Sequence, residues 1–224
     1  MKKMKKIVSV VMILSVVIAC GVLNTPQVVM ASQKSDALSA YKVFLKENKW
    51  DEGEAGTLSG KYFGLKDLNG DKIPELIINQ GENKKGKRAY AIFTYNAKEK
   101  YVDELYCSWL LDECYYNSEK KYIIDKATSD VSEELRVFKI TKKGNYKDVM
   151  SATMQNYDGK YTSAMVNGKK ASYKKTKSKI DSYLEKAKLI KTPYKINSKN
   201  IKKSCRETVG KTRHKAAFCV VREP

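Results

Sequence analysis

The chain has 224 residues, of which 42% are hydrophobic and 10% aromatic, enough for one domain with its own core and barely enough for two small ones. It carries 44 Lys and Arg against 25 Asp and Glu, a formal net charge of +19. His214 is the only histidine in the chain. A Ser-His-Asp or Cys-His catalytic site would therefore have to use it. Motifs of the HExxH, Walker A and GxGxxG kinds are absent from the sequence.

The positive charge is concentrated in the last third of the chain. Residues 1–31 contain 4 Lys and no acidic residue, and residues 32–140 contain 18 basic and 19 acidic residues. Residues 141–224 contain 22 basic and 6 acidic residues. Such a polarised distribution bears on the partners of a protein more than on its fold, and it indicates an anionic partner.

The N-terminus has the pattern of a secretory signal peptide over residues 1–31. Lysines in MKKMKK precede the apolar run IVSVVMILSVVIACGVL, which is shorter than a typical membrane-spanning helix. Small residues before Ser32 favour cleavage after Ala31. The stretch VIAC resembles a lipobox, so lipidation at Cys20 is the alternative, and an uncleaved anchor is a third. All three alternatives predict a secreted or cell-surface protein of Gram-positive type.

A helix is predicted next, and then a series of short strands. Residues 35–49 carry apolar side chains at helical spacing behind a possible N-cap, Ser35. The acidic segment 51–60 is expected to be a link. The strand-like segments are 61–67, 75–79, 88–96, 100–110, 121–125, 135–141, 146–155 and 160–166. Short connections rich in Gly and Asn predict an antiparallel meander.

The C-terminal part contains one more helical pattern, over residues 173–190. Its first turns are rich in lysine, the wrong charge for a helix N-terminus, so a start at Ser178 with Asp181 in a capping-box-like position is the alternative. The predicted fold class is therefore α+β, with an antiparallel β-meander sheet flanked by an N-terminal and a C-terminal helix. The domain is expected to span 32–190, followed by a basic, loosely structured tail over 191–224.

The segment DLNGDKIPE places oxygen ligands at alternate positions. Counting Asp67 as position 1, side-chain oxygens fall at 1, 3, 5 and 9 and a main-chain carbonyl at 7. Ca²⁺ takes six to eight such oxygens, and a tight loop brings alternate residues to one side. The predicted metal ligands are Asp67, Asn69, Asp71, the carbonyl of Ile73, and Glu75. Because Asp and Asn are also common turn residues, a plain Asx-rich turn is the competing interpretation.

The segment DLNGDKIPELII resembles the calcium loop of FG-GAP-type blades and the first half of an EF-hand loop. It departs from the EF-hand pattern at position 6, which is Lys72, and at position 12, which is Ile78. Over about residues 35–200 the order of elements is similar to a loose group of uncharacterised clostridial secreted proteins and lipoproteins. The resemblance implies location, architecture and a calcium loop, and it implies no activity. Lys72, at a position that prefers positive φ, predicts that Ca²⁺ binds weakly.

The sequence favours a non-catalytic secreted or cell-surface module. We expect calcium to stabilise it and its basic C-terminal region to bind an anionic envelope polymer or a membrane surface. An exported enzyme or a carbohydrate-binding protein with an unidentified site is the alternative, and export disfavours a nucleic-acid partner. Cys107, Cys114, Cys205 and Cys219 allow three disulfide pairings, which the sequence leaves open.

Overall fold

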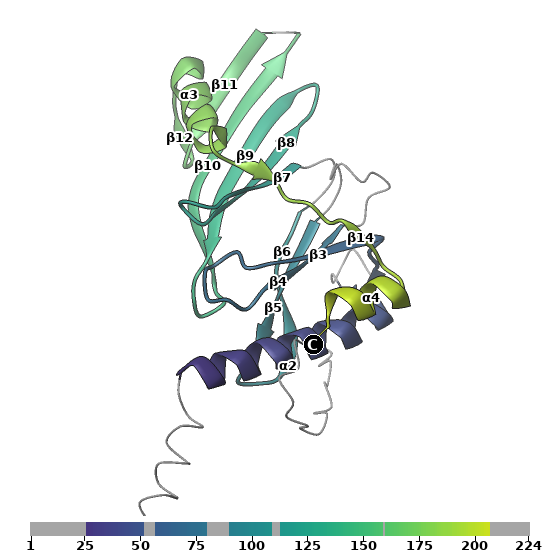
Figure 1. The fold of residues 1–224 in the computed structure, drawn as a ribbon. Helices are drawn as coiled ribbons and strands as arrows, with labels where there is room; N and C mark the ends of the chain where they lie inside the picture. Colours follow the sequence, from purple (N-terminus) through teal and green to yellow (C-terminus); the bar gives the residue numbers. More distant parts are fainter. Residues whose placement is uncertain (1–25, 52–56, 80–89, 109–112, 159, 207–224) are drawn as a thin grey trace, which may run out of the picture.

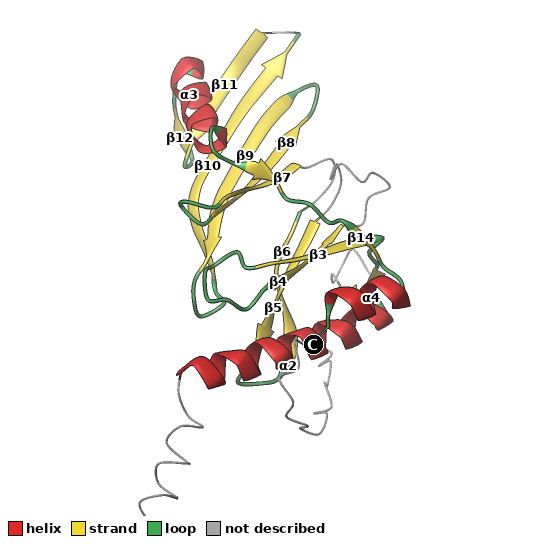
Figure 2. Ribbon diagram, viewed as in Figure 1, coloured by secondary structure: helices red, strands yellow, loops and turns green. Residues whose placement is uncertain are grey.

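The computed structural model describes residues 26–51, 57–79, 90–108, 113–158 and 160–206. In these residues the chain forms two larger antiparallel sheets, a two-stranded hairpin and three helices (Figures 1 and 2). The predicted α+β class with an antiparallel meander is confirmed. The meander is divided between two sheets, which the sequence did not predict. Most of the expected signal peptide lies outside the described residues.

The five-stranded sheet has the strand order β14-β3-β4-β5-β6, and every neighbouring pair is antiparallel. Its strands are β3 (Tyr62–Lys66), β4 (Glu75–Asn79), β5 (Tyr90–Asn96), β6 (Tyr101–Cys107) and β14 (Tyr194–Lys195). All five residues of β4 are buried. A strand buried on both faces indicates that this sheet lies between two other layers.

The seven-stranded sheet has the order β12-β11-β10-β9-β8-β7-β13, also antiparallel throughout. Its strands are β7 (Glu113–Asn117), β8 (Tyr122–Thr128), β9 (Ser132–Ile140), β10 (Tyr146–Tyr157), β11 (Lys160–Val166), β12 (Lys169–Lys170) and β13 (Lys188–Leu189). Strand β7 was not predicted. The small hairpin pairs β1 (Trp50–Asp51) with β2 (Thr57–Leu58), so the expected acidic link 51–60 contains strand at residues 51, 57 and 58.

Helix α2 (Pro26–Glu47) begins earlier than predicted. Ser35 lies inside it, so the assignment of Ser35 as the N-cap was wrong. Proline is favoured at the first helical position, where its missing N–H is not needed. The expected cleavage point after Ala31 also falls within this helix. No helix among the described residues is both long and apolar enough to span a bilayer.

Helix α3 (Tyr173–Leu184) begins at the earlier of the two predicted starts and ends before residue 190. Ser172 caps it by accepting a hydrogen bond from Lys175 N at 3.3 Å. The start at Ser178 was wrong because this cap and the buried Thr176 and Ile180 hold the first turns in place despite their lysines.

The prediction of a loose tail from residue 191 was wrong for residues 191–206. Strand β14 pairs with β3, and helix α4 (Ser198–Ser204) packs on α2. Ile201 and Cys205 are 3% and 6% exposed, so apolar burial holds this segment to the fold. The returning chain approaches β3 so closely that a Cβ at Gly64 would lie 2.7 Å from a main-chain oxygen of Lys191. Residues 207–224 lie outside the described part.

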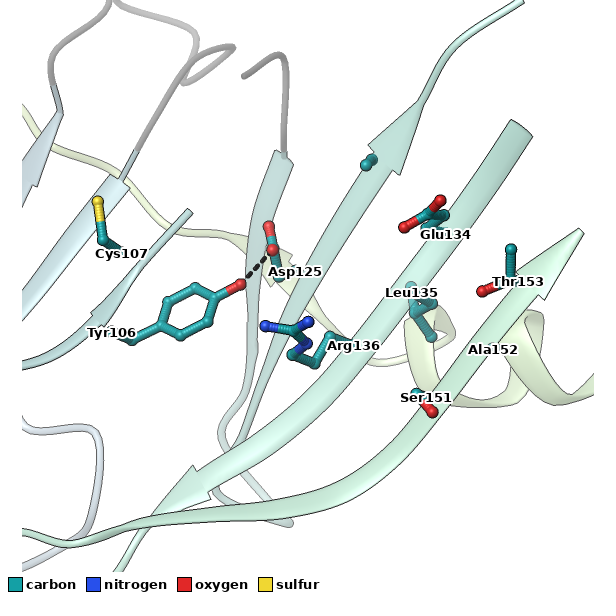
Figure 3. Close-up of a pocket in the computed structure, with 10 residues that line it drawn as sticks. Tyr106, Cys107, Asp125, Glu134, Leu135, Arg136, Ser151, Ala152 and Thr153 are labelled. Carbon is teal, nitrogen blue, oxygen red and sulfur yellow. Dashed lines mark hydrogen bonds between the residues drawn. The ribbon is translucent and has the colours of Figure 1, made fainter. Parts of the chain in front are cut away.

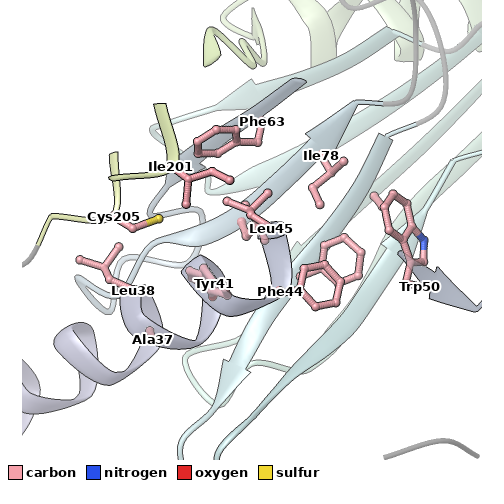
Figure 4. Close-up of a cluster of buried hydrophobic side chains, with 13 residues drawn as sticks. Ala37, Leu38, Tyr41, Phe44, Leu45, Trp50, Phe63, Ile78, Ile201 and Cys205 are labelled. Carbon is pink, nitrogen blue, oxygen red and sulfur yellow. The ribbon is translucent and has the colours of Figure 1, made fainter. Parts of the chain in front are cut away.

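Three apolar clusters show how the layers stack. The first joins α2 and α4 to one face of the five-stranded sheet (Figure 4); its largest members include Tyr41, Phe44, Phe63 and Phe93. The second contains Ile77 and Ile92 from that sheet with Ile123 and Phe138 from the other, so it lies between the sheets. The third packs the outer face of the seven-stranded sheet on α3. The result is a helix–sheet–sheet–helix arrangement with a shared core between the sheets.

Candidate functional site

The predicted calcium loop connects β3 to β4 and is closed by its own side chains. Asp67 accepts hydrogen bonds from Gly70 N at 2.6 Å and Lys72 N at 3.0 Å. Asp71 Oδ1 accepts from Ile73 N at 2.7 Å. Two residues of the loop have positive φ: Gly70 at 83° and Lys72 at 71°. Glycine adopts this conformation freely, whereas a lysine there is strained.

Three oxygens converge on the side-chain nitrogen of Asn69. Asp71 Oδ2 lies 2.9 Å from Asn69 Nδ2, Glu75 Oε1 lies 3.1 Å from it, and the carbonyl oxygen of Thr141 lies 3.3 Å from it. An amide nitrogen carries two hydrogens, so it cannot satisfy three acceptors with full hydrogen bonds. The cluster therefore has more acceptors than donors at this point, which is the environment that a bound cation favours.

Glu75 is the buried member of the cluster, with 1% of its surface exposed. Leu68 N donates to its Oε2 at 2.7 Å. Burial raises the pKa of Glu75 to about 8, and the Asp71 carboxylate adds to the rise. The charged form of Glu75 is thus disfavoured near neutral pH, and a neighbouring cation would restore it.

The loop also holds the two sheets together. Tyr116 of β7 donates from its hydroxyl to the carbonyl of Leu68 at 3.2 Å. Asn69 reaches Thr141, just after β9, on the other side. Sequence reasoning missed Thr141 because it lies 72 residues from Asn69 and contributes only its backbone. Anything that orders this loop therefore also stabilises the contact between the sheets.

The five predicted ligands are placed by the structure as follows. Asn69, Asp71 and Glu75 are brought together, and Asn69 faces the two carboxylates with its side-chain nitrogen. The Asn69 side-chain oxygen accepts from Asp71 N at 2.9 Å, and the oxygens of Asp67 are likewise engaged by backbone N–H groups of the loop. Ile73 packs its side chain against the first apolar cluster. In the described part of the chain, no three Asp, Glu, His or Cys side chains form a metal-binding group by themselves. A calcium ion here would thus depend on main-chain carbonyls as well as carboxylates, and Asn69 would have to turn its side-chain oxygen toward the ion.

The basic region has its own geometry. Between residues 141 and 206 the sequence contains 18 Lys and Arg against 4 acidic residues. Most of these lysines are exposed, on α3, on α4 and on the edge strands β12, β13 and β14. Within the described residues, two of them form ion pairs: Lys177 with Asp181, and Lys186 with Glu119 at 3.2 Å. The surface therefore carries a large excess of unneutralised positive charge.

Comparison with known proteins adds no assignment. No family model, no curated protein and no solved structure matches the chain.

Proposed function

We propose that the chain is a non-catalytic secreted or cell-surface module that binds anionic envelope polymers through its basic C-terminal region. The observation that carries the proposal is the exposed excess of lysine between residues 141 and 206. A phosphate-rich polymer such as a teichoic acid supplies the complementary charge. Its many repeats also allow weak contacts to add up.

The lysines in the first turn of α3 do not stabilise the helix. Lys174 and Lys175 occupy the first turn of the helix, which contains no acidic residue. Cations at a helix N-terminus oppose the helix dipole by about 0.3–1 kcal/mol each. Beside them, the rings of Tyr161 and Tyr173 stack with centroids 3.9 Å apart while remaining 45% and 39% exposed. An exposed aromatic pair flanked by lysines favours a binding surface.

Calcium at the 67–75 loop is the second part of the proposal. Asp71, Glu75, Asn69 and the carbonyls of Ile73 and Thr141 would hold the ion, with Asp67 shaping the loop. The excess of acceptors around Asn69 and the raised pKa of Glu75 support this assignment. The ion would supply charge compensation and would stabilise the junction of the two sheets. Strain at Lys72 favours weak binding, on the order of 10⁻⁴–10⁻³ M as in extracellular modules.

Lysines on edge strands also prevent sheets from pairing edge to edge, and this is the competing explanation for part of the charge. It applies to β12, β13 and β14 and does not apply to the first turn of α3. The two explanations make different predictions about binding. Truncation at Lys191 would not separate them, because it removes buried residues of α4 and so damages the fold.

Charge reversal tests the proposal without truncation. We expect the parent protein to co-sediment with lipoteichoic acid at about 0.1 M salt and to be released at about 1 M, where the Debye length falls from about 10 Å to about 3 Å. Reversing Lys174, Lys175 and Lys179 to Glu should abolish binding. The matched control reverses three exposed lysines outside the region, Lys46, Lys61 and Lys98. Absence of binding in the parent, or equal loss in both triple variants, would contradict the proposal.

A further inference from the structure

Five large apolar or aromatic side chains are exposed in the described part of the chain, and four of them lie at one end of the seven-stranded sheet. These four are Val131, Tyr157, Tyr161 and Tyr173, and the most exposed is Tyr157 at 70%. The fifth, Val43, lies on α2, which Figure 1 shows at the other end of the molecule. Exposed apolar side chains that gather in one place mark an interaction surface.

Contacts between three segments bring the four side chains together. Asn156 N donates to the carbonyl of Val131 at 2.8 Å, which joins the β8–β9 turn to the end of β10. Asn156 is directly opposite Tyr161 of β11, and Tyr157 follows it in the chain. The Tyr161 ring stacks on Tyr173 of α3 with centroids 3.9 Å apart. These four side chains form the aromatic tip of the sheet.

A β-bulge in β11 turns Tyr161 toward α3. Opposite one step of β10, strand β11 takes two, and its extra residue is Thr162. The shift puts Tyr161 opposite Asn156, on the face of the third apolar cluster, which packs on α3. Regular alternation from the buried Ala164 would point Tyr161 away from Tyr173. Bulges that re-aim a side chain are common beside functional sites, so the tyrosine pair is a built feature of this surface.

Charged side chains of both signs flank the aromatic tip, and they lie on different elements. Asp130 and Asp158 are exposed in the β8–β9 and β10–β11 turns, each beside an apolar residue of the tip. Lys174 and Lys175 are exposed in the first turn of α3, directly after Tyr173. None of these four charged groups forms an ion pair with another described residue. Carboxylates are therefore free at the turns, and ammonium groups are free on the helix.

The cavity on the inner face of the same sheet does not separate charges in this way. It has a volume of about 280 Å³ and is lined by Glu134 and Arg136 of one strand, with Asp125 directly opposite Arg136 (Figure 3). The unpaired oxygen of Asp125 is buried, so a ligand in the cavity does not reach it. Opposite charges this close together favour no one class of ligand.

We propose that the aromatic tip and the first turn of α3 bind a polymer whose repeats carry both a sugar ring and a phosphate group. This inference rests on the proposed binding of an anionic envelope polymer, and it names the repeat that the surface fits. The apolar face of a sugar ring stacks on the exposed tyrosine rings, and its hydroxyls donate to Asp130 or Asp158. The phosphate groups pair with Lys174 and Lys175.

Two other anionic partners fit these charges less well. Nucleic-acid bases also stack on aromatic side chains, but a phosphate at every nucleotide would meet the carboxylates of Asp130 and Asp158. An anionic membrane interface accepts tyrosine and valine, yet it would bring its headgroups against the same two carboxylates. A sugar ring instead offers hydroxyl donors at that point.

The experiment compares two phosphate polymers at equal phosphate concentration: poly(glycerol phosphate), and the same polymer with glucosyl substituents. Binding to the full chain is measured by isothermal titration calorimetry at about 0.1 M salt. We expect the glucosylated polymer to bind about fivefold more tightly, which is in the range for an aromatic contact. An oligothymidylate of matched charge is the third probe and should bind more weakly than the glucosylated polymer.

Variants of the tyrosine pair test the stacking. Tyr161→Ala and Tyr173→Ala should each remove most of the preference for the glucosylated polymer. Both should keep the parent affinity for poly(glycerol phosphate), because the two side chains are exposed and the lysines remain. Tyr161→Phe retains the ring and should retain the preference. Val43→Ala, at the exposed apolar residue of α2, is the matched control and should also retain it.

The inference is overturned if the parent protein binds the two phosphate polymers equally, if the preference survives both alanine variants, or if the oligothymidylate binds more tightly than the glucosylated polymer. In these cases poly(glycerol phosphate) still binds, so the proposed function stands. If the parent protein binds neither phosphate polymer, the proposed function itself is wrong, and this inference is overturned with it.

Discussion

Glu75 and Asp125 are both buried carboxylates, and they differ in how the fold satisfies them. Both oxygens of Glu75 accept hydrogen bonds from within its own loop, from Leu68 N and Asn69 Nδ2. One oxygen of Asp125 is hydrogen-bonded and the other has no partner among the described residues, and its neighbours come from other strands, Tyr106 of β6 and Arg136 of β9. The first arrangement has surplus acceptors that a metal ion would balance. The second leaves one buried acceptor without a hydrogen-bond partner among the described residues.

The largest expected effect is a pH dependence of the free energy of unfolding that comes from Glu75. Burial raises its pKa from 4.5 to about 8, so between these values the unfolded chain loses a proton that the folded chain keeps. In calcium-free buffer with EDTA, this group should lower the free energy of unfolding as the pH rises from about 4.5 to about 8. At about 1.4 kcal/mol per unit the total is on the order of 4 kcal/mol.

Urea unfolding at a series of pH values measures this effect. Glu75→Gln should remove most of the slope in that window, because the amide does not titrate. Glu99→Gln, at an exposed carboxylate, is the control and should retain it. Equal slopes for the parent protein and Glu75→Gln would show that burial of Glu75 is not the source.

A smaller effect is expected at Asp125. Tyr106→Phe removes the one hydrogen-bond donor that the described residues supply to this buried carboxylate. At pH 7 the free energy of unfolding should fall by about 2 kcal/mol, the usual range for a bond to a charged group. A double-mutant cycle with Asp125→Asn isolates the pair, and the second change should cost less when the first is present. Strictly additive losses would mean that the two residues do not interact.

The smallest effect concerns backbone strain in the calcium loop. Lys72 has φ of 71°, so Lys72→Gly should relieve strain and stabilise the chain by about 0.5–1 kcal/mol, allowing for the entropy of glycine. Lys98→Gly, in a turn where φ is not positive, should be neutral or destabilising. Thermal unfolding in EDTA compares the two. Destabilisation by Lys72→Gly comparable to that by Lys98→Gly would contradict the strain argument.

The sequence predicted what depends on neighbours along the chain. Strands β3, β4 and β11 lie within one residue of their predicted ends because alternation and turn residues are local features. The oxygen loop could be predicted for the same reason, since the hydrogen bonds that close it on itself join residues within nine positions, whereas its bonds to Thr141 and Tyr116 could not. The strained position 72 was also apparent, because the calcium-loop pattern places a glycine there.

The rest depends on contacts that no local pattern contains. Residues 191–206 have no periodicity, yet Ile201 and Cys205 are buried because α4 packs on α2, about 160 residues earlier. The division into two sheets depends on strand pairing across the fold. Asp125 lies in a strand-like segment where alternation alone shows which face a residue takes, and not what it meets there.

Calcium binding is the part of the account that one measurement tests most directly. Thermal unfolding is followed while Ca²⁺ is titrated into the EDTA-treated chain, with Asp71→Ala as the test variant and Asp130→Ala, at an exposed turn residue, as the control. A ligand that binds only the folded state stabilises it by about 1.4 kcal/mol at ten times its dissociation constant. We predict a rise in melting temperature for the parent protein and for Asp130→Ala, and none for Asp71→Ala. If the parent shows no rise at about 10 mM Ca²⁺, well above the expected affinity, or if Asp71→Ala rises equally, the loop is a turn and not a calcium site.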